Sequence, residues 1–139
     1  MIPLQSRILP HMGRVTSQVT VSNAISPEKQ MTLSALVDTG AAYLCLPKAW
    51  KDRFGDFIST DVLEFETANQ ATIKGEVCGP VKIEVEGFRP VNSEVLFIDM
   101  QPDDGVYEPL LGYIPLEQCA AAVDMLGHRL VHARKIDLK

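Results

Sequence analysis

The sequence predicts one domain of the all-β class, with one short helix near its C-terminal end. Its 139 residues suffice for a single hydrophobic core, and 46% of them are hydrophobic, which is ordinary for a globular protein. Short runs rich in Val, Ile, Thr and Leu dominate, and scattered Pro and Gly residues separate them. We therefore expect residues 1–139 to form one domain, too small to hold a cleft between two full lobes.

The first half of the chain contains three predicted strands. Residues 15–21 alternate between apolar and polar side chains, as a half-buried strand does, and a polar loop with Pro follows. Residues 31–37 form the next strand and lead directly into Asp38-Thr39-Gly40. Residues 43–46 form a short buried strand that ends at a proline, after which residues 47–54 favour one or two turns of helix.

The second half begins with a predicted hairpin. Residues 62–67 and 71–77 both alternate, and the short polar tip Ala68-Asn69-Gln70 separates them. Two further strands are expected at residues 81–87 and 90–98, before a polar loop rich in Asp and Pro.

The C-terminal part holds the predicted helix. Pro115 suits a first helical position, and Leu116, Cys119, Ala120 and Val123 have helical apolar spacing. A turn and a last strand at residues 129–132 complete the expected order of elements.

Charge and cysteine content restrict the partners. The net charge of −5 has no basic stripe, so we expect no nucleic-acid partner, and no apolar run is long enough to span a membrane. Residues 1–7 do not have the pattern of a signal peptide. Cys45, Cys78 and Cys119 are odd in number and form no C-x-x-C pair, which predicts buried thiols, no metal site and a cytoplasmic location.

The segment Leu36-Val37-Asp38-Thr39-Gly40-Ala41 carries the strongest chemical signal. Two apolar residues fix the approaching strand in the core, so the carboxylate of Asp38 emerges at the end of a rigid element. Gly40 permits a tight turn with backbone N–H groups directed at that carboxylate, and the hydroxyl of Thr39 can bond to nearby backbone. Asp, Thr and Gly are also common turn residues, so the tripeptide alone leaves a structural role open.

The order of features resembles that of the retroviral-type (retropepsin-like) aspartic proteases and their bacterial single-lobe relatives. The Asp-Thr-Gly motif, the later hairpin, and Leu110-Leu111-Gly112 before a helix follow one another across residues 13–132. The resemblance implies a single-lobe acid-protease fold, a closed β-barrel with one short C-terminal helix. It also implies a protease that needs no metal and no organic cofactor.

The resemblance assigns roles to particular positions. Asp38 looks like the catalytic aspartate, Thr39 like the residue that grips a partner chain, and Gly40 like a backbone contact to substrate. The remaining implied site residues are Ala41 in the same loop, Ala68, Asn69 and Gln70 at the tip of the substrate-covering flap, and Leu110, Leu111 and Gly112 in the segment behind the loop.

The number of carboxylates then predicts the assembly. Aspartic-protease chemistry uses two carboxylates that share a proton and a water molecule, one as base and one as acid. This chain has one Asp-Thr-Gly, and the other aspartates lack the combination of a buried approach and a following Thr-Gly. The second carboxylate is therefore expected from Asp38 of an identical chain, in a two-fold homodimer that cleaves a peptide or protein substrate.

Two further expectations concern activity. Ala41 cannot donate a hydrogen bond where pepsin-like enzymes often have Ser, so we expect a pH optimum nearer mildly acidic to neutral. The flap tip is not rich in Gly, and Tyr113-Ile114-Pro115 replaces the acidic brace common after Gly112. These departures keep open an alternative, a non-catalytic peptide-binding or assembly module on the same fold.

Overall fold

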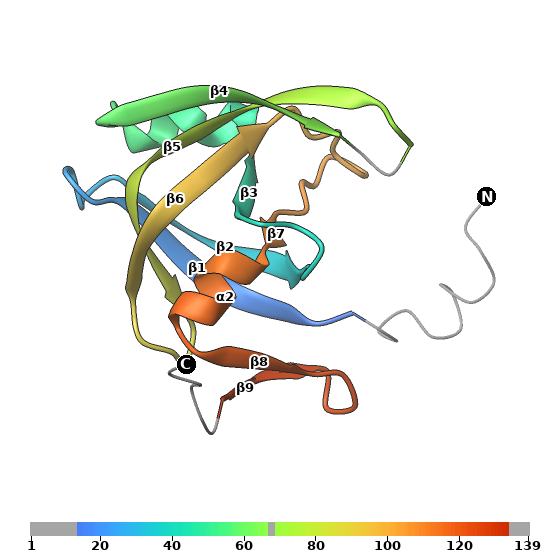
Figure 1. The fold of residues 1–139 in the computed structure, drawn as a ribbon. Helices are drawn as coiled ribbons and strands as arrows, with labels where there is room; N and C mark the ends of the chain where they lie inside the picture. Colours follow the sequence, from blue (N-terminus) through green and yellow to red (C-terminus); the bar gives the residue numbers. More distant parts are fainter. Residues whose placement is uncertain (1–13, 67–68, 134–139) are drawn as a thin grey trace, which may run out of the picture.

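The strands of the chain form a seven-stranded sheet and a separate two-stranded hairpin in the computed structural model, which describes residues 14–66 and 69–133 (Figure 1). In chain order the elements are β1 (Thr16–Asn23), β2 (Gln30–Val37), β3 (Leu44–Pro47), the 3-10 helix η1 (Lys48–Phe54), β4 (Ser59–Glu66), β5 (Thr72–Val85), β6 (Val91–Ile98), β7 (Leu110–Leu111), α2 (Tyr113–Gln118), β8 (Ala121–Asp124) and β9 (Arg129–His132).

The large sheet closes on itself. Its strands follow the order β1-β2-β7-β3-β6-β5-β4, and β1 also pairs with β5. This additional pairing, from Val19↔Val85 to Asn23↔Val81, joins six strands into a ring and leaves β4 outside it as an edge strand. The predicted all-β class and the predicted closure are therefore confirmed.

The alternation read from the sequence explains how β1 and β2 pair. Val19 lies opposite Leu33, and both side chains are buried inside the ring. Thr20 and Thr32 lie opposite one another on the outer face, where their hydroxyls are 2.9 Å apart and form a hydrogen bond. A period of two thus places apolar side chains in the core and polar ones outside.

Two predicted boundaries are wrong. The expected strands at 71–77 and 81–87 are one continuous strand, β5, because the pairing with β6 shifts register between Cys78 and Val81 and then resumes. The expected helix from Pro115 to Val123 ends at Gln118, because Ala120 has a left-handed φ of 57° and β8 begins at the next residue. Of the apolar residues that suggested this helix, Leu116 belongs to α2 and Val123 belongs to β8.

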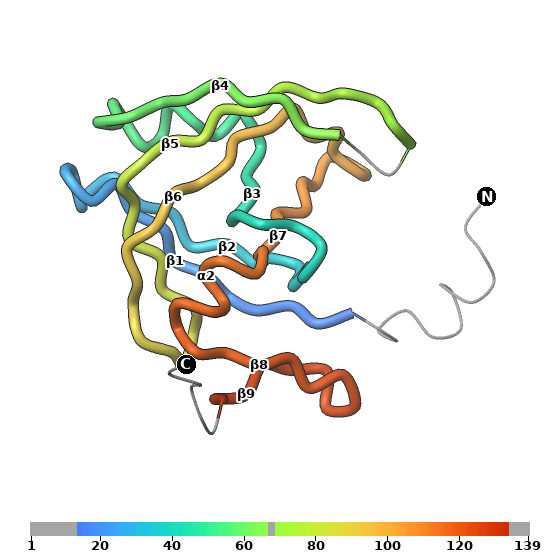
Figure 2. The backbone as a smooth tube through the Cα atoms, viewed as in Figure 1, coloured from blue at the N-terminus to red at the C-terminus, as the bar shows by residue number. Residues whose placement is uncertain are grey.

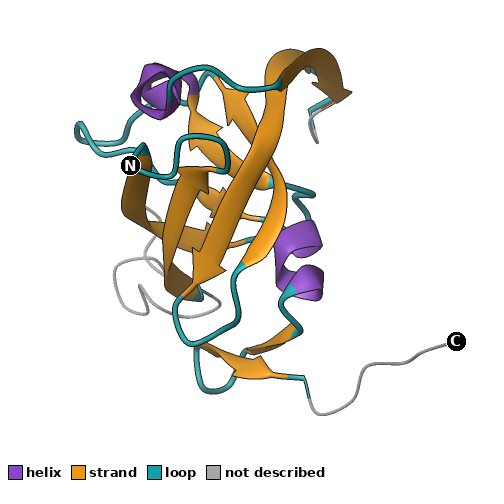
Figure 3. Ribbon diagram, turned by 90° about the vertical axis from the view of Figure 1, so that its left-hand side faces the viewer, coloured by secondary structure: helices purple, strands orange, loops and turns teal. Residues whose placement is uncertain are grey.

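The core is organised around three aromatic rings. The ring centroids of Phe54 and Phe97 are 5.8 Å apart, and Phe57 lies 5.8 Å from Phe97. Leu116 of α2 and Cys119 are buried in the same cluster. In Figure 3 the two helices lie on opposite flanks of the sheet, with the β8–β9 hairpin below it.

A buried asparagine connects the end of β1 to the end of η1. The side-chain amide of Asn23 donates to the carbonyl oxygens of Phe54 and Asp56, each at 2.8 Å. Its own Oδ1 accepts from the backbone N–H of Ile25 at 3.0 Å. Asn23 is 1% exposed, so water cannot replace these partners.

We predict that Asn23→Ala lowers the free energy of unfolding by about 2–4 kcal/mol, because it leaves buried backbone groups without partners. Urea denaturation of the two proteins measures the difference. Thr20→Val, which removes an exposed hydroxyl pair, is the matched control and should change stability by less than about 0.5 kcal/mol. Equal effects of the two substitutions would contradict a structural role for Asn23.

Candidate active site

Asp38 stands directly after β2, at a point where three strands meet. Leu36 and Val37 pair in parallel with Leu110 and Leu111 of β7. The backbone N–H of Asp38 continues this ladder by donating to the carbonyl of Leu111 at 3.0 Å. The position of Asp38 is therefore fixed by backbone pairing on the strand that precedes it.

The residues after Asp38 fold back on its carboxylate. The N–H of Gly40 donates to Asp38 Oδ1 at 2.9 Å, and the N–H of Ala41 donates to the Asp38 carbonyl at 3.1 Å. A Cβ atom on Gly40 would lie 3.2 Å from that same Oδ1, which is a tight contact. The turn predicted from the sequence is confirmed, including the N–H directed at the carboxylate.

The turn leaves its outer side open. Asp38 is half-buried, whereas Thr39 and Gly40 are exposed. Within the described residues, Asp38 Oδ2 and the Thr39 hydroxyl have no hydrogen-bond partner. Both groups can therefore interact with a molecule outside this chain.

Gly112 holds the Asp38 loop (residues 38–43) from behind. Its N–H donates to the carbonyl of Tyr43 at 3.0 Å, and the next two N–H groups donate to Ala41 and Ala42, each at 2.9 Å. A Cβ atom on Gly112 would lie 2.4 Å from the Tyr43 carbonyl oxygen and 2.6 Å from that of Ala41. Only glycine fits there, and Figure 2 shows β7 passing between β2 and β3 just before it.

The resemblance assigns the tip between β4 and β5 to the substrate-covering flap. Asn69 and Gln70 are exposed, Gln70 has a φ of 62°, and Ala68 lies outside the described residues. None of the hydrogen bonds of the described residues joins Asn69 or Gln70 to the Asp38 loop. In Figure 1 the tip extends on the same side of the molecule as the end of β2.

A sequence profile of the Aspartyl protease family matches residues 17–113, which include the Asp38 loop and Gly112. The chain belongs to the aspartyl protease family. No curated protein matches the chain.

A solved structure gives the same fold for this aspartyl protease family member. EIAV protease, in complex with the inhibitor HBY-793, superposes with a TM-score of 0.57 and 20% identity, and the match covers 80% of this chain and 92% of that one. The fold is retropepsin-like, as expected. A Legionella pneumophila protein of unknown function, Lpg0085, has a TM-score of 0.43 and 18% identity over 78% of this chain and 88% of its own.

An apolar wall adjoins the Asp38 loop, and sequence reasoning did not find it. Its buried members are Cys45, Val77 and Leu96. Partly buried hydrophobic side chains from the loop, β4, β6, the segment after β6, and β7 pack against them: Ala41, Tyr43, Phe65, Ile98, Met100 and Leu110. Leu96 pairs with Cys45 on one side and with Val77 on the other, so strand pairing places the three buried residues side by side.

The thiol in this wall is not a nucleophile. Burial, with a further contribution from the charge of Asp38, raises the pKa of Cys45 to about 12. Burial also raises the pKa values of Cys78 and Cys119 above the ordinary value for a thiol. All three cysteines are free and buried, as predicted, and stay protonated at neutral pH.

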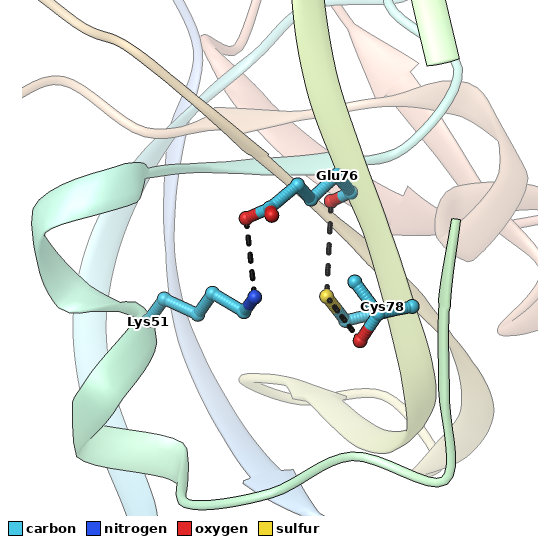
Figure 4. Close-up of polar contacts among 4 residues, drawn as sticks. Lys51, Glu76 and Cys78 are labelled. Atoms are coloured by element: carbon cyan, nitrogen blue, oxygen red, sulfur yellow. Dashed lines mark hydrogen bonds and ion pairs between the residues drawn. The ribbon is translucent and has the colours of Figure 1, made fainter. Parts of the chain in front are cut away.

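An ion pair joins the strand that carries the tip to η1. Lys51 Nζ lies 3.1 Å from Glu76 Oε2, and both side chains are more than two-thirds buried (Figure 4). Next to it, the thiol of Cys78 donates to the Glu76 carbonyl and contacts the Thr60 hydroxyl. The base of the β4–β5 hairpin is thereby tied to η1 as well as to β6.

A pocket of about 330 Å³ lies on the other side of Asp38. Val37, Asp38 and Thr39 line it from β2 and the loop, and Val15, Val123 and Met125 complete it. The sequence did not indicate Val123 and Met125, because the expected helix ran through Val123.

Residues 14–66 and 69–133 were compared with the requirements of a metal site and of a membrane-spanning helix. No group of three His, Cys, Asp or Glu side chains in this part of the chain could hold a metal ion. None of its helices is long and apolar enough to cross a membrane.

We predict that Gly112→Ala displaces the Asp38 loop, because the new methyl group overlaps two backbone carbonyls that cannot move independently. The expected loss of stability is about 2–4 kcal/mol, measured by urea denaturation. Gly87→Ala is a control for glycine replacement without overlap, since a Cβ there meets nothing within 4 Å, although its φ of 89° adds strain. A loss for Gly112→Ala no larger than for Gly87→Ala would contradict the role of the crossing.

Proposed function

We propose that this protein is an aspartic endopeptidase that acts as a homodimer, with Asp38 of each copy supplying one of the two catalytic carboxyls. The observation that carries the proposal is the Asp38 turn. Its carboxylate accepts one hydrogen bond from the Gly40 N–H on Oδ1, and Oδ2 remains available. Membership of the aspartyl protease family supports the same reaction class.

The two carboxyls have different tasks in this mechanism. A water molecule lies between them, and the ionised carboxylate takes its proton while the water attacks the peptide carbonyl. The protonated carboxyl polarises that carbonyl and stabilises the developing oxyanion. The water adds directly, so no acyl-enzyme forms, and collapse of the tetrahedral intermediate releases the amine after it accepts a proton.

The proposed homodimer follows from the sequence, in which Asp38 is the one aspartate that Thr-Gly follows. Asp104, which also precedes a glycine, lies in an exposed loop with a φ of 51°. Asp124 is engaged with Gly127 and Arg129 in the β8–β9 turn. Neither follows a core strand as Asp38 does, so a second copy is the simplest source of the other carboxyl.

The substrate we propose is an extended peptide. The partly buried side chains of the apolar wall beside Asp38, such as Phe65, Ile98 and Met100, suit apolar substrate side chains, and strand-like backbone pairing would align the scissile bond. Free, buried thiols fit a reducing compartment, so we place the protein in the cytoplasm.

A second candidate is peptide binding without cleavage. The observation that favours it is the edge strand β4, which pairs only with β5 among the described strands. Two of its apolar side chains are exposed, Val62 at 64% and Leu63 at 41%. A peptide could add to this edge as a further strand.

We predict that Asp38→Asn reduces cleavage of a peptide library at least about a hundred-fold, because the variant loses acid–base catalysis. Cleavage is measured by mass spectrometry between about pH 4 and 8. The matched control is Asp104→Asn, since Asn tolerates the left-handed backbone of that residue, and its activity should equal that of the wild type.

Three outcomes discriminate between the candidates. Cleavage that survives Asp38→Asn would show that the site is assigned wrongly. A wild-type protein that is strictly monomeric and cleaves nothing would refute the endopeptidase. Binding of library peptides without cleavage, unchanged in Asp38→Asn, would establish the second candidate.

We predict that Ala41→Ser shifts the acidic limb of the pH–rate profile downward. A serine hydroxyl in the loop can donate to the carboxylate and so favours its ionised form. Ala42→Ser, at the next position in the chain, controls for the added hydroxyl. A profile that is unchanged or moves upward in Ala41→Ser would refute the assignment of Ala41 to the carboxylate's surroundings.

A further inference from the structure

The turn between β8 and β9 exposes two large apolar side chains. Leu126 is 97% exposed, which is more than any other large hydrophobic residue in the described part of the chain. Its neighbour Met125 is 52% exposed. Because Met125 and Leu126 are adjacent, they form an exposed apolar patch rather than a single scattered residue, and such a patch can mark an interaction surface.

The turn that presents Leu126 is rigidly built. Asp124 Oδ1 accepts the N–H of Gly127 at 2.9 Å, and Asp124 Oδ2 lies 3.4 Å from Arg129 Nε. A Cβ atom on Gly127 would lie 2.4 Å from Asp124 Oδ2, so a side chain there would displace the carboxylate that closes the turn. The hydrogen bond from Gly127 lowers the pKa of Asp124, and the carboxylate that closes the turn therefore stays ionised at neutral pH.

A pocket with mostly apolar lining lies beside this turn. Met125 forms part of its wall, and the Asp38 loop contributes Asp38 and Thr39. Val15 and Val123 supply further apolar surface, and the volume is about 330 Å³. One surface of the molecule therefore carries both a projecting leucine and an apolar pocket.

We propose that Leu126 of each copy enters the pocket beside Asp38 of the other copy, so that the β8–β9 turn is the dimer-forming element. The inference rests on the proposed function, which requires two copies of Asp38 to meet. In a two-fold dimer the same patch serves both partners, so each patch must contain both a projection and its receptor. This patch has both.

The position of the pocket favours a second copy over other occupants. Its wall contains Asp38 and Thr39, the residues that the catalytic dimer must bring to the two-fold axis. A second copy that places its Leu126 in this pocket offers its own pocket to Leu126 of the first copy. The two Asp38 loops, which form part of these pockets, are then next to each other. A different protein in the pocket would keep the second carboxyl away.

The test measures the dimer dissociation constant of the full chain by sedimentation equilibrium. Leu126→Glu should raise it about a hundred-fold or more, because two buried leucines are lost in each dimer. Leu126→Met should keep the wild-type value, since it retains an apolar side chain of similar size. Ile25→Glu is the matched control: Ile25 is 59% exposed in the loop between β1 and β2, at the other end of the molecule in Figure 1.

Peptide cleavage by the same variants separates this inference from the proposed function. Leu126→Glu should lose activity at low protein concentration and regain it at high concentration, because its Asp38 loop is unchanged. A dimer that Leu126→Glu weakens, but which never cleaves peptide, would support the interface and refute the endopeptidase. A dimeric wild type whose dissociation constant is the same in Leu126→Glu would overturn the interface alone, and a monomeric wild type would overturn both.

Discussion

The close contact between Gly112 and the Asp38 loop is the constraint on which the rest of the site depends. Three successive N–H groups, from Gly112 to Ile114, donate to the carbonyls of Tyr43, Ala41 and Ala42. Because these bonds satisfy the backbone of an irregular loop, the loop can be rigid without being a strand. These bonds keep the N–H of Gly40 directed at the Asp38 carboxylate. Backbone hydrogen bonds therefore determine the position of the carboxylate.

The ring of strands explains why this contact occurs. The short strand β7 pairs in parallel with β2 and antiparallel with β3, so it lies between the two strands that enter and leave the Asp38 loop. A segment in this position must cross behind the loop before it can continue into α2. The pairing of β6 with β3 on one side and with β5 on the other places Cys45, Leu96 and Val77 next to one another, and they form one apolar wall next to Asp38.

The features that could be predicted from the sequence are those specified by neighbouring residues. The turn at Asp38 follows from two apolar residues, a carboxylate and a glycine, whereas the place of Gly112 behind the loop was implied by the resemblance to the retropepsin-like proteases. The end of α2 could not be predicted, because the pairing of β8 with β9 replaces helical bonds that the apolar spacing alone would favour. The pocket that contains Val123 and Met125 was missed for the same reason: it exists only where the hairpin meets the loop.

A dimer that joins two Asp38 loops must overcome the repulsion it creates. Two ionised carboxylates about 4 Å apart repel by about 4 kcal/mol at an effective dielectric constant near 20, and a shared proton removes most of that repulsion. Burial of two Leu126 side chains contributes about 3–6 kcal/mol in the proposed interface, which is the same magnitude. The nearby charged side chains add little to the electrostatic energy of the interface, because they are paired within the chain. Arg14 pairs with Glu108 at 2.7 Å, and Asp124 pairs with Arg129. In the proposed dimer the apolar contact would therefore offset the repulsion between the carboxyls, and protonation of the pair and assembly of the dimer would favour one another.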